Sequence, residues 1–221
     1  MVVCSDIKKI YSAGATQVHA LRGVSLSIAD GEFVAIAGPS GSGKTTLLNI
    51  IGALDLPSAG TVKVGTLELH NSGDAERTSY RSKHMGFIFQ SFNLIPVLTA
   101  LENVALSLAL NGVKRKERVD RAREALVEVG LGGMEDRRPG RLSGGQQQRV
   151  AVARALVKKP HVVLADEPTA NLDSETGGAI LELMRRLNEK HGTTFVFSTH
   201  DSMVMQFSDR VIGIHDGLIS S

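Results

Sequence analysis

Hydrophobic and polar positions alternate in the first part of the chain, and short apolar blocks follow. The pattern predicts strands at Val18–Ile28, Phe33–Ala37 and Gly60–Leu69, the last being a short strand pair that begins after a proline-containing turn. Met85–Gln90 is a compact apolar strand that ends on a polar residue. The N-terminal part of the chain is therefore expected to be rich in β-structure.

After Gln90 the pattern changes to helical spacing for about sixty residues. Helices are predicted at Leu101–Leu110 and Glu117–Val129, and a third helix follows Ser143 and runs through Leu156. A proline-glycine pair marks the loop before this third helix. We therefore expect a helical lobe that is inserted between two parts of a β-rich core.

Strand and helix patterns alternate again from His161 onward. A buried strand at Val162–Ala165 precedes a helix with one apolar face, and a further strand follows at Thr194–Ser198. The last predicted strand pair turns at Asp216 and Gly217, a good hairpin signal. Such alternation predicts an α/β fold, in which helices cover a parallel sheet. The apolar helix face holds Ile180, Leu183, Met184 and Leu187.

Length and composition favour one domain. The chain has 221 residues with 42% hydrophobic content, enough to bury one substantial core without disulfides or metal. We expect a single domain over residues 1–221, with a core formed by 1–90 and 158–221 and a helical subdomain at 91–157. The single cysteine, Cys4, excludes an internal disulfide and fits a reducing compartment, the cytoplasm.

Charge and hydropathy restrict the partners. The formal net charge is +2 with 22% charged residues, too balanced to predict a nucleic-acid partner. The basic stretch Lys114–Arg121 is interpreted as a solvated helix face. We expect no secretory signal, because no basic segment followed by an apolar core begins the chain. Val97–Val113 is too short and too polar to cross a bilayer, so action at a membrane would require another polypeptide.

Residues 38–45 read Gly-Pro-Ser-Gly-Ser-Gly-Lys-Thr, between a predicted strand and a helix-like stretch. Glycines let successive backbone N–H groups turn toward one phosphate cluster at the positive end of the helix. Lys44 adds a positive charge for the outer phosphates, and Thr45 offers a hydroxyl to Mg²⁺. The strand-to-helix setting argues against the alternative of a chance glycine-rich turn. The predicted triphosphate-binding residues are Gly38, Pro39, Ser40, Gly41, Ser42, Gly43, Lys44, Thr45 and Thr46.

Two carboxylates end the apolar strand at Val162–Ala165. Asp166 and Glu167 follow it directly, at the strand end where ligands of open α/β sheets bind. Asp166 is placed to hold Mg²⁺, directly or through water, and Glu167 to orient or deprotonate an attacking water. The alternative is an acidic pair that ends the strand in solvent, and the phosphate-binding pattern upstream argues against it.

The segment Leu142–Gln146 has features of a second anion site. Ser143 can cap the following helix, two glycines permit a close backbone approach, and the first N–H groups of the helix lack internal partners. A capped helix with a flexible start explains the same pattern equally well. The local sequence leaves both interpretations open.

The string Leu142, Ser143, Gly144, Gly145 and Gln146, together with the phosphate loop and Ala165–Pro168, resembles the ATP-binding cassette (ABC) ATPases over nearly the whole chain. The resemblance implies a P-loop fold with a mostly parallel core sheet, an N-terminal antiparallel β subdomain and an inserted helical subdomain. It also implies ATP and Mg²⁺ as ligands. In a head-to-tail homodimer, Ser143 and Gly145 of one subunit would complete the ATP site around Lys44 of the other.

The resemblance assigns roles to four further residues. Gln90 resembles the glutamine that senses Mg²⁺ and the attacking water, and His200 resembles the switch histidine at the γ-phosphate. Asp173 resembles the aspartate that crosses the dimer interface, and Tyr11 the aromatic residue that stacks on adenine. Their alternatives are a polar strand end, a solvated turn, a helix cap and a tyrosine at the end of an edge strand. The implied Mg²⁺ residues are Thr45, Gln90 and Asp166.

A subgroup resemblance rests on Phe87–Pro96, Leu98–Val104 and Gln146–Arg149, which are similar to macrolide-export and lipoprotein-release ATPases. Ser91–Leu101 would then receive a short helix of an integral membrane permease, although internal packing of this segment is the alternative. The implied function is an ATPase subunit at the cytoplasmic face of the membrane. It would drive export, movement of a lipoprotein or lipid-linked substrate, or mechanical signalling.

Three other functions are alternatives to this one. A phosphotransferase would leave Ser143–Gln146 and Glu167 without a purpose. Soluble ABC-type ATPases that act on DNA or ribosomes carry a long coiled-coil insertion or two cassettes, and this sequence has neither. A regulatory ABC ATPase of the cell-division type stays open as the alternative to transport.

Overall fold

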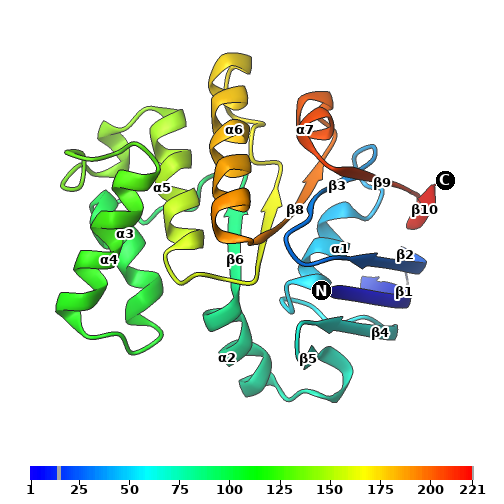
Figure 1. Cartoon of the computed structure of the whole chain (residues 1–221). Helices are drawn as coiled ribbons and strands as arrows, with labels where there is room; N and C mark the ends of the chain where they lie inside the picture. Colours follow the sequence, from blue (N-terminus) through cyan, green and yellow to red (C-terminus); the bar gives the residue numbers. More distant parts are fainter. Residues whose placement is uncertain (14–15, 221) are drawn as a thin grey trace.

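The computed structural model describes residues 1–13 and 16–220, which form two β-sheets and the helices packed against them (Figure 1). The first sheet is antiparallel, in the order β2-β1-β4-β5. Its strands are β1 (Val2–Ala13), β2 (Thr16–Ile28), β4 (Ala59–Val64) and β5 (Leu67–Glu68). The second sheet has the order β10-β9-β3-β8-β7-β6, and all its pairs except β10 with β9 are parallel. Its strands are β3 (Phe33–Ala37), β6 (Met85–Phe89), β7 (Val162–Asp166), β8 (Thr194–Thr199), β9 (Arg210–His215) and β10 (Leu218–Ser220).

Helices connect the strands of the second sheet and form a lobe beside it (Figure 1). The lobe contains α3, α4 and α5, and α5 also packs against β6. The α-helices are α1 (Lys44–Ile51), α2 (Asp74–His84), α3 (Ala100–Ala109), α4 (Arg115–Glu128), α5 (Gly144–Leu156), α6 (Ser174–His191) and α7 (Ser202–Phe207). Short 3-10 turns lie at Leu69–Asn71 and Pro139–Arg141. This architecture confirms the predicted fold class.

The second sheet contributes side chains to two hydrophobic cores, one on each face, because successive side chains of a strand point to opposite faces. Phe33 and Ala35 of β3 belong to the core shared with α3, α4, α5 and α6. Val34 and Ile36 of the same strand belong to the core shared with α1 and the antiparallel sheet. Every residue of β3 is buried, which is why its sequence is continuously apolar.

Three elements escaped the sequence analysis. Strand β1 breaks the alternation with register shifts between Cys4 and Ile7, where Asp6 has a φ of 49°. Helix α2 has no buried residue, so it shows no apolar periodicity. Helix α7 is only 6 residues long.

Gln90 lies in the turn just after β6 rather than in the strand.

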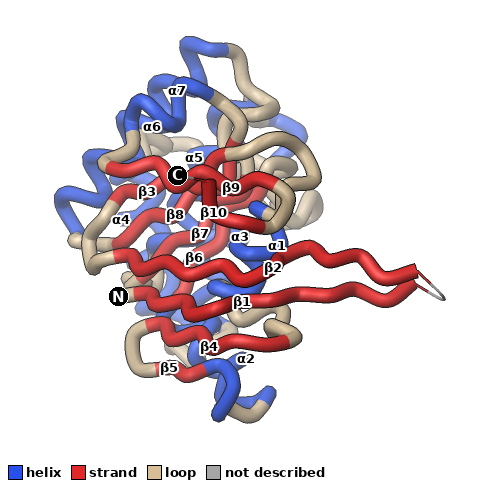
Figure 2. The backbone as a smooth tube through the Cα atoms, turned by 90° about the vertical axis from the view of Figure 1, so that its right-hand side faces the viewer, coloured by secondary structure: helices blue, strands red, loops and turns tan. Residues whose placement is uncertain are grey.

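The β1–β2 hairpin extends beyond the body of the molecule (Figure 2). It exposes 40% of Tyr11 and 52% of Val18, which are register partners on the two strands. Since β1 lies between β2 and β4, Tyr11 is not on an edge strand, although β4 pairs with β1 only as far as Lys8.

No helix within residues 1–13 and 16–220 combines the length and the apolar character that crossing a bilayer requires.

Cys4 is a chemical probe of the folded state. It is 2% exposed, and burial raises the pKa of its thiol to about 12. Since the thiolate is the reactive form, we expect the native protein to resist thiol reagents at neutral pH. Absorbance during reaction with Ellman's reagent would follow one thiol per chain in denaturant and a far slower reaction in native buffer. Equal rates in both conditions would contradict the buried position of β1.

Candidate nucleotide-binding site

The phosphate loop joins β3 to α1 and has a backbone that only glycine tolerates at several points. Gly41 and Gly43 have φ values of 80° and 105°, in the left-handed region. A Cβ on Gly43 would lie 2.6 Å from the carbonyl oxygen of Ala20, and one on Gly38 would lie 2.1 Å from that of Ile214. The glycines therefore serve both the loop conformation and its packing against β2 and β9.

Lys44 begins α1, and its ammonium lies inside the phosphate loop. The Nζ atom donates to the carbonyl oxygens of Gly38 at 2.7 Å and Pro39 at 2.9 Å. The residue is only 7% exposed. Gly43, as the N-cap, supplies no side-chain cap to α1, so first-turn N–H groups and the ammonium present positive charge at one place. This arrangement can bind a phosphate group.

Thr45 and Asp166 meet at the carboxyl end of β7. The Thr45 hydroxyl lies 3.2 Å and 3.3 Å from the two carboxylate oxygens of Asp166. Hydroxyl and carboxylate oxygens are the hard ligands that Mg²⁺ accepts alongside phosphate oxygens and water. The residues present thus fit a magnesium ion that is held partly by nucleotide.

Glu167 leaves the strand in an unusual conformation, with a φ of 46°. Its carboxylate accepts a hydrogen bond from the Thr199 hydroxyl at 3.2 Å and lies 2.7 Å from Nδ1 of His200. The glutamate side chain is 16% exposed and that of His200 is 69% exposed. Asp166 and Glu167 therefore act on different neighbours, Asp166 on α1 and Glu167 on the loop after β8.

Gln90 is exposed in the turn after β6, the strand that pairs with β7. Register places Phe89 opposite Asp166, so Gln90 lies beside the carboxylate pair. Its carbonyl oxygen accepts a hydrogen bond of 2.9 Å from Nδ2 of Asn171. This contact links Gln90 to the loop between β7 and α6.

The structure shows Ser143 as a helix cap. Its hydroxyl accepts from the N–H of Gln146 at 3.3 Å, and Oε1 of Gln146 accepts from the N–H of Ser143 at 3.0 Å. Gly144 and Gly145 open α5, and a Cβ on Gly145 would lie 2.5 Å from Cγ2 of Thr176. Leu142 is buried beneath this helix start. Among the described residues no hydrogen bond joins Leu142–Gln146 to the phosphate loop.

Asp173 also caps a helix, the neighbouring α6. Its carboxylate accepts from the N–H and the hydroxyl of Thr176, both at 2.8 Å. The backbone N–H of Thr176 lowers the pKa of Asp173, and the hydroxyl contact lowers it further. The carboxylate is exposed, so capping leaves it accessible to a partner.

Tyr11 is anchored through its hydroxyl, which donates to Oδ2 of Asp55 at 2.8 Å. The ammonium of Lys9 lies 4.8 Å from its ring centroid. Burial raises the pKa of Tyr11, and the hydrogen bond to Asp55 raises it further. The hydroxyl end of the ring is thus held beside Asp55, which follows α1 in the chain.

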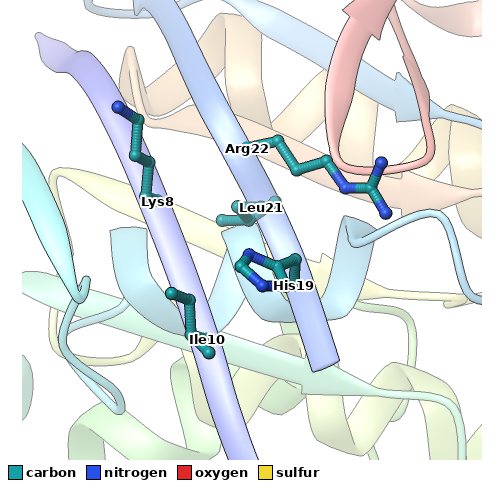
Figure 3. Close-up of a pocket in the computed structure, with 5 residues that line it drawn as sticks. All are labelled: Lys8, Ile10, His19, Leu21 and Arg22. Carbon is teal, nitrogen blue, oxygen red and sulfur yellow. The ribbon is translucent and has the colours of Figure 1, made fainter. Parts of the chain in front are cut away.

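A hollow of about 490 Å³ on the β1–β2 hairpin was missed by the sequence analysis (Figure 3). Two cationic side chains line it, together with an imidazole and two aliphatic residues. Its lining residues are Lys8, Ile10, His19, Leu21 and Arg22. Cross-strand pairing of Lys8 with Arg22 and of Ile10 with His19 brings these side chains together. No local sequence motif therefore predicts the hollow.

The fold and this arrangement of loop, lysine and carboxylates are those of a P-loop nucleoside-triphosphate-binding domain. A family model described as ABC transporter matches residues 21–170. An uncharacterized ABC transporter ATP-binding protein of Thermotoga maritima is 51% identical over 214 residues, covering 97% of this chain and 91% of that protein. The lipoprotein-releasing system ATP-binding protein LolD of Geobacter metallireducens is 45% identical over 97% of this chain and 95% of its own length.

Two further comparisons bear on the whole chain. The macrolide export ATP-binding/permease protein MacB of Rhodopirellula baltica is 45% identical over the whole chain, which spans only 32% of MacB. The dimeric post-hydrolysis structure of the ATP-binding cassette MJ0796 of Methanocaldococcus jannaschii, bound to ADP and Pi, matches with a TM-score of 0.91 and 47% identity. It covers 100% of this chain and 97% of that chain.

The chain therefore belongs to the ABC transporter family. It is an ATP-binding transporter subunit that hydrolyses ATP, and its relatives confirm the predicted resemblance to macrolide-export and lipoprotein-release ATPases. The cell-division alternative is not favoured by these relatives.

Proposed function

We propose that two copies of this chain close head-to-tail on two ATP molecules and thereby move a separate integral membrane partner. One observation supports the dimer. The start of α5 and the phosphate loop both offer N–H groups for phosphate, yet no hydrogen bond joins these two segments within the described chain. A second copy would bring Ser143 and Gly145 to the ATP held by Lys44. The dimeric MJ0796 structure, at 47% identity, supports this arrangement.

In the proposed site, residues 38–46 bind the triphosphate and Tyr11 supports the adenine ring. Thr45, Asp166 and Gln90 would hold Mg²⁺, which when bound would neutralise charge between the outer phosphates. Glu167 then orients the attacking water and accepts its proton, and the contact with His200 fixes the carboxylate.

Two contacts prepare the proposed interface. Asp173 is held in place by Thr176 while its carboxylate stays exposed. Ser143 is already positioned by its reciprocal bonds with Gln146, in which its hydroxyl oxygen accepts, so the hydroxyl hydrogen is free to donate to a phosphate. Both features support a role of these residues in contact with a second copy.

The proposed contact with the membrane partner lies at Ser91–Leu101. Ile95 and Val97 are 38% and 72% exposed there. The guanidinium of Arg154 donates to the carbonyl oxygens of Phe92, at 2.8 Å, and Asn93, and both residues have positive φ. The backbone of this segment is therefore held by Arg154 and presents exposed apolar side chains, which suits contact with an apolar helix of a permease.

The names of the relatives support the class of transport that we propose, which is export or the release of a lipoprotein or lipid-linked substrate. LolD is a lipoprotein-releasing system protein and MacB carries a permease within one longer chain. We place this chain as a peripheral subunit at the cytoplasmic face of a membrane, held by such a permease. No nucleic-acid partner is proposed.

Mixing two defective variants tests the shared site. In a Glu167→Gln background, Lys44→Ala and Ser143→Arg should each abolish ATP-dependent dimers, because both composite sites lose one half. In the mixture, one site combines an intact Lys44 with an intact Ser143. We expect an affinity-tagged Lys44→Ala chain to capture untagged Ser143→Arg chains when Mg-ATP is added.

The control is each variant mixed with an untagged copy of itself, where no intact site can form. Capture in the mixture at the level of these self-mixtures would show that Lys44 and Ser143 do not serve one site in two chains.

A further inference from the structure

Gln148 is a buried polar side chain that the functions assigned so far do not use. It lies in α5 and is 0% exposed. Its Nε2 donates to the carbonyl oxygen of Pro168 at 2.6 Å, while Oε1 has no hydrogen-bond partner among the described residues. Burying an unpaired amide oxygen costs stability, and an aliphatic side chain of similar size would avoid that cost. The contact with Pro168 is therefore what distinguishes Gln148 from an aliphatic residue at this position.

Pro168 directly follows Glu167. The left-handed φ of Glu167 is costly for a residue with a side chain and persists only where neighbours hold it. On one side the carboxylate is held by Thr199 and His200, and the N–H of Glu167 donates to the carbonyl oxygen of Ser198 at 2.9 Å. On the other side, Gln148 holds the next carbonyl along the chain.

The N-terminus of α5 carries the proposed contact with the partner's ATP. The helix begins at Gly144 with Ser143 as its cap, and Gln148 follows within two turns. Helix hydrogen bonds make so short a segment move as one body. A shift of the helix start therefore moves the amide of Gln148 and, through it, the carbonyl that follows Glu167.

We propose that Gln148 is a positioning residue that couples occupation of the partner's ATP site, sensed at Ser143, to the orientation of Glu167 at the chain's own site. This inference rests on the proposed head-to-tail dimer. In each subunit, the helix start and Glu167 serve different nucleotides, so the coupling makes hydrolysis at the two sites interdependent. Gln148 is fully buried and lies outside the predicted nucleotide-binding residues, so we expect it to act only through Pro168.

Removing the amide should separate turnover from binding. We expect Gln148→Leu to lower kcat about tenfold or more and to reduce cooperativity in ATP, with ATP affinity unchanged. In a Glu167→Gln background, the same variant should still form the Mg-ATP dimer. Asn188→Leu is the matched control, because Asn188 is a buried helical amide that donates to the carbonyls of Gly31 and Thr193. It should lower stability and leave kcat per folded molecule unchanged.

Gln148→Glu adds a readout that a purely structural role would not move. Burial raises the pKa of a carboxyl group, so the introduced group gains a proton as pH falls. Only the protonated form has an O–H that can donate to the carbonyl of Pro168. The ratio of variant to wild-type kcat should therefore rise as pH falls from about 8 to about 6.

Three results would overturn the positioning role. They are a kcat of Gln148→Leu within about twofold of wild type, a parallel loss of ATP affinity and dimerisation, or a pH-independent ratio for Gln148→Glu. The dimer itself is judged separately, on Glu167→Gln with Gln148 intact. Failure of that protein to dimerise would remove the proposed function, whereas a normal dimer with a normal Gln148→Leu kcat removes only the coupling.

Discussion

Glu167→Gln is expected to lower ATP turnover by about 10²- to 10⁴-fold while ATP binding is retained. The amide has nearly the same shape as the carboxylate, and its oxygen can still accept from the Thr199 hydroxyl. It cannot accept a proton from the attacking water, so the chemical step alone is lost. With hydrolysis blocked, the ATP-bound dimer should accumulate. Steady-state phosphate release, nucleotide binding and size-exclusion chromatography in Mg-ATP measure the three effects.

Glu128→Gln is the matched control for this variant. Glu128 also forms a glutamate–histidine contact, with Oε1 2.9 Å from Nε2 of His191, and it additionally binds Lys190. This pair joins α4 to the end of α6, away from the phosphate loop. Its turnover should stay within about twofold of wild type. Retained turnover in Glu167→Gln, or an equal loss in Glu128→Gln, would remove Glu167 from the proposed role.

Lys44→Ala is expected to weaken ATP binding by about ten- to a hundredfold, because a charge-assisted contact with the outer phosphates is lost. The buried ammonium now donates to Gly38 and Pro39, so its removal also leaves two loop carbonyls without that donor. The loss should be larger for ATP than for AMP, since the contact proposed for the lysine is with the outer phosphates. Titration calorimetry with both nucleotides tests the expectation.

Lys158→Ala controls for the loss of a partly buried lysine. The Nζ atom of Lys158 also donates to two backbone carbonyls, those of Arg81 at 3.0 Å and Ser82 at 2.9 Å. Burial lowers the pKa of this lysine to about 8. Lys158 follows α5, and its ammonium contacts the C-terminal part of α2 rather than the phosphate loop. Its variant should bind ATP as wild type does. Unchanged ATP affinity in Lys44→Ala would refute the role predicted for the loop.

Much of the fold could be predicted because its signals are local. The fully buried strand β3 is a continuous apolar run, the fully buried strand β8 contains the apolar run Phe195–Phe197, and α6 shows its apolar face at helical spacing. The hairpin turn at Asp216 and Gly217 was predicted correctly, and both residues have the positive φ that its turn type requires. Helix α2 was missed because all its residues are at least partly exposed, so no burial pattern marks it.

The candidate site divides in the same way. The phosphate loop and the segment at Leu142–Gln146 are contiguous, and each combines glycines with a helix start, so short strings of sequence reveal them. The tertiary structure added the side chains that these site residues contact. Glu167 meets His200 across 33 residues, and Thr45 meets Asp166 across 121, because parallel strands end at one edge of the sheet.

The sequence by itself determined the class of fold and the family and predicted the nucleotide loop, since these depend on local backbone conformation and on residue spacing within single elements. Only the tertiary structure decided which side chains meet across elements. The bond from Gln148 to Pro168 and the hollow between Lys8 and Arg22 depend on how α5 packs against the β7 loop and how β1 registers with β2. Such contacts follow from the packing of distant segments, to which no local pattern in the chain corresponds.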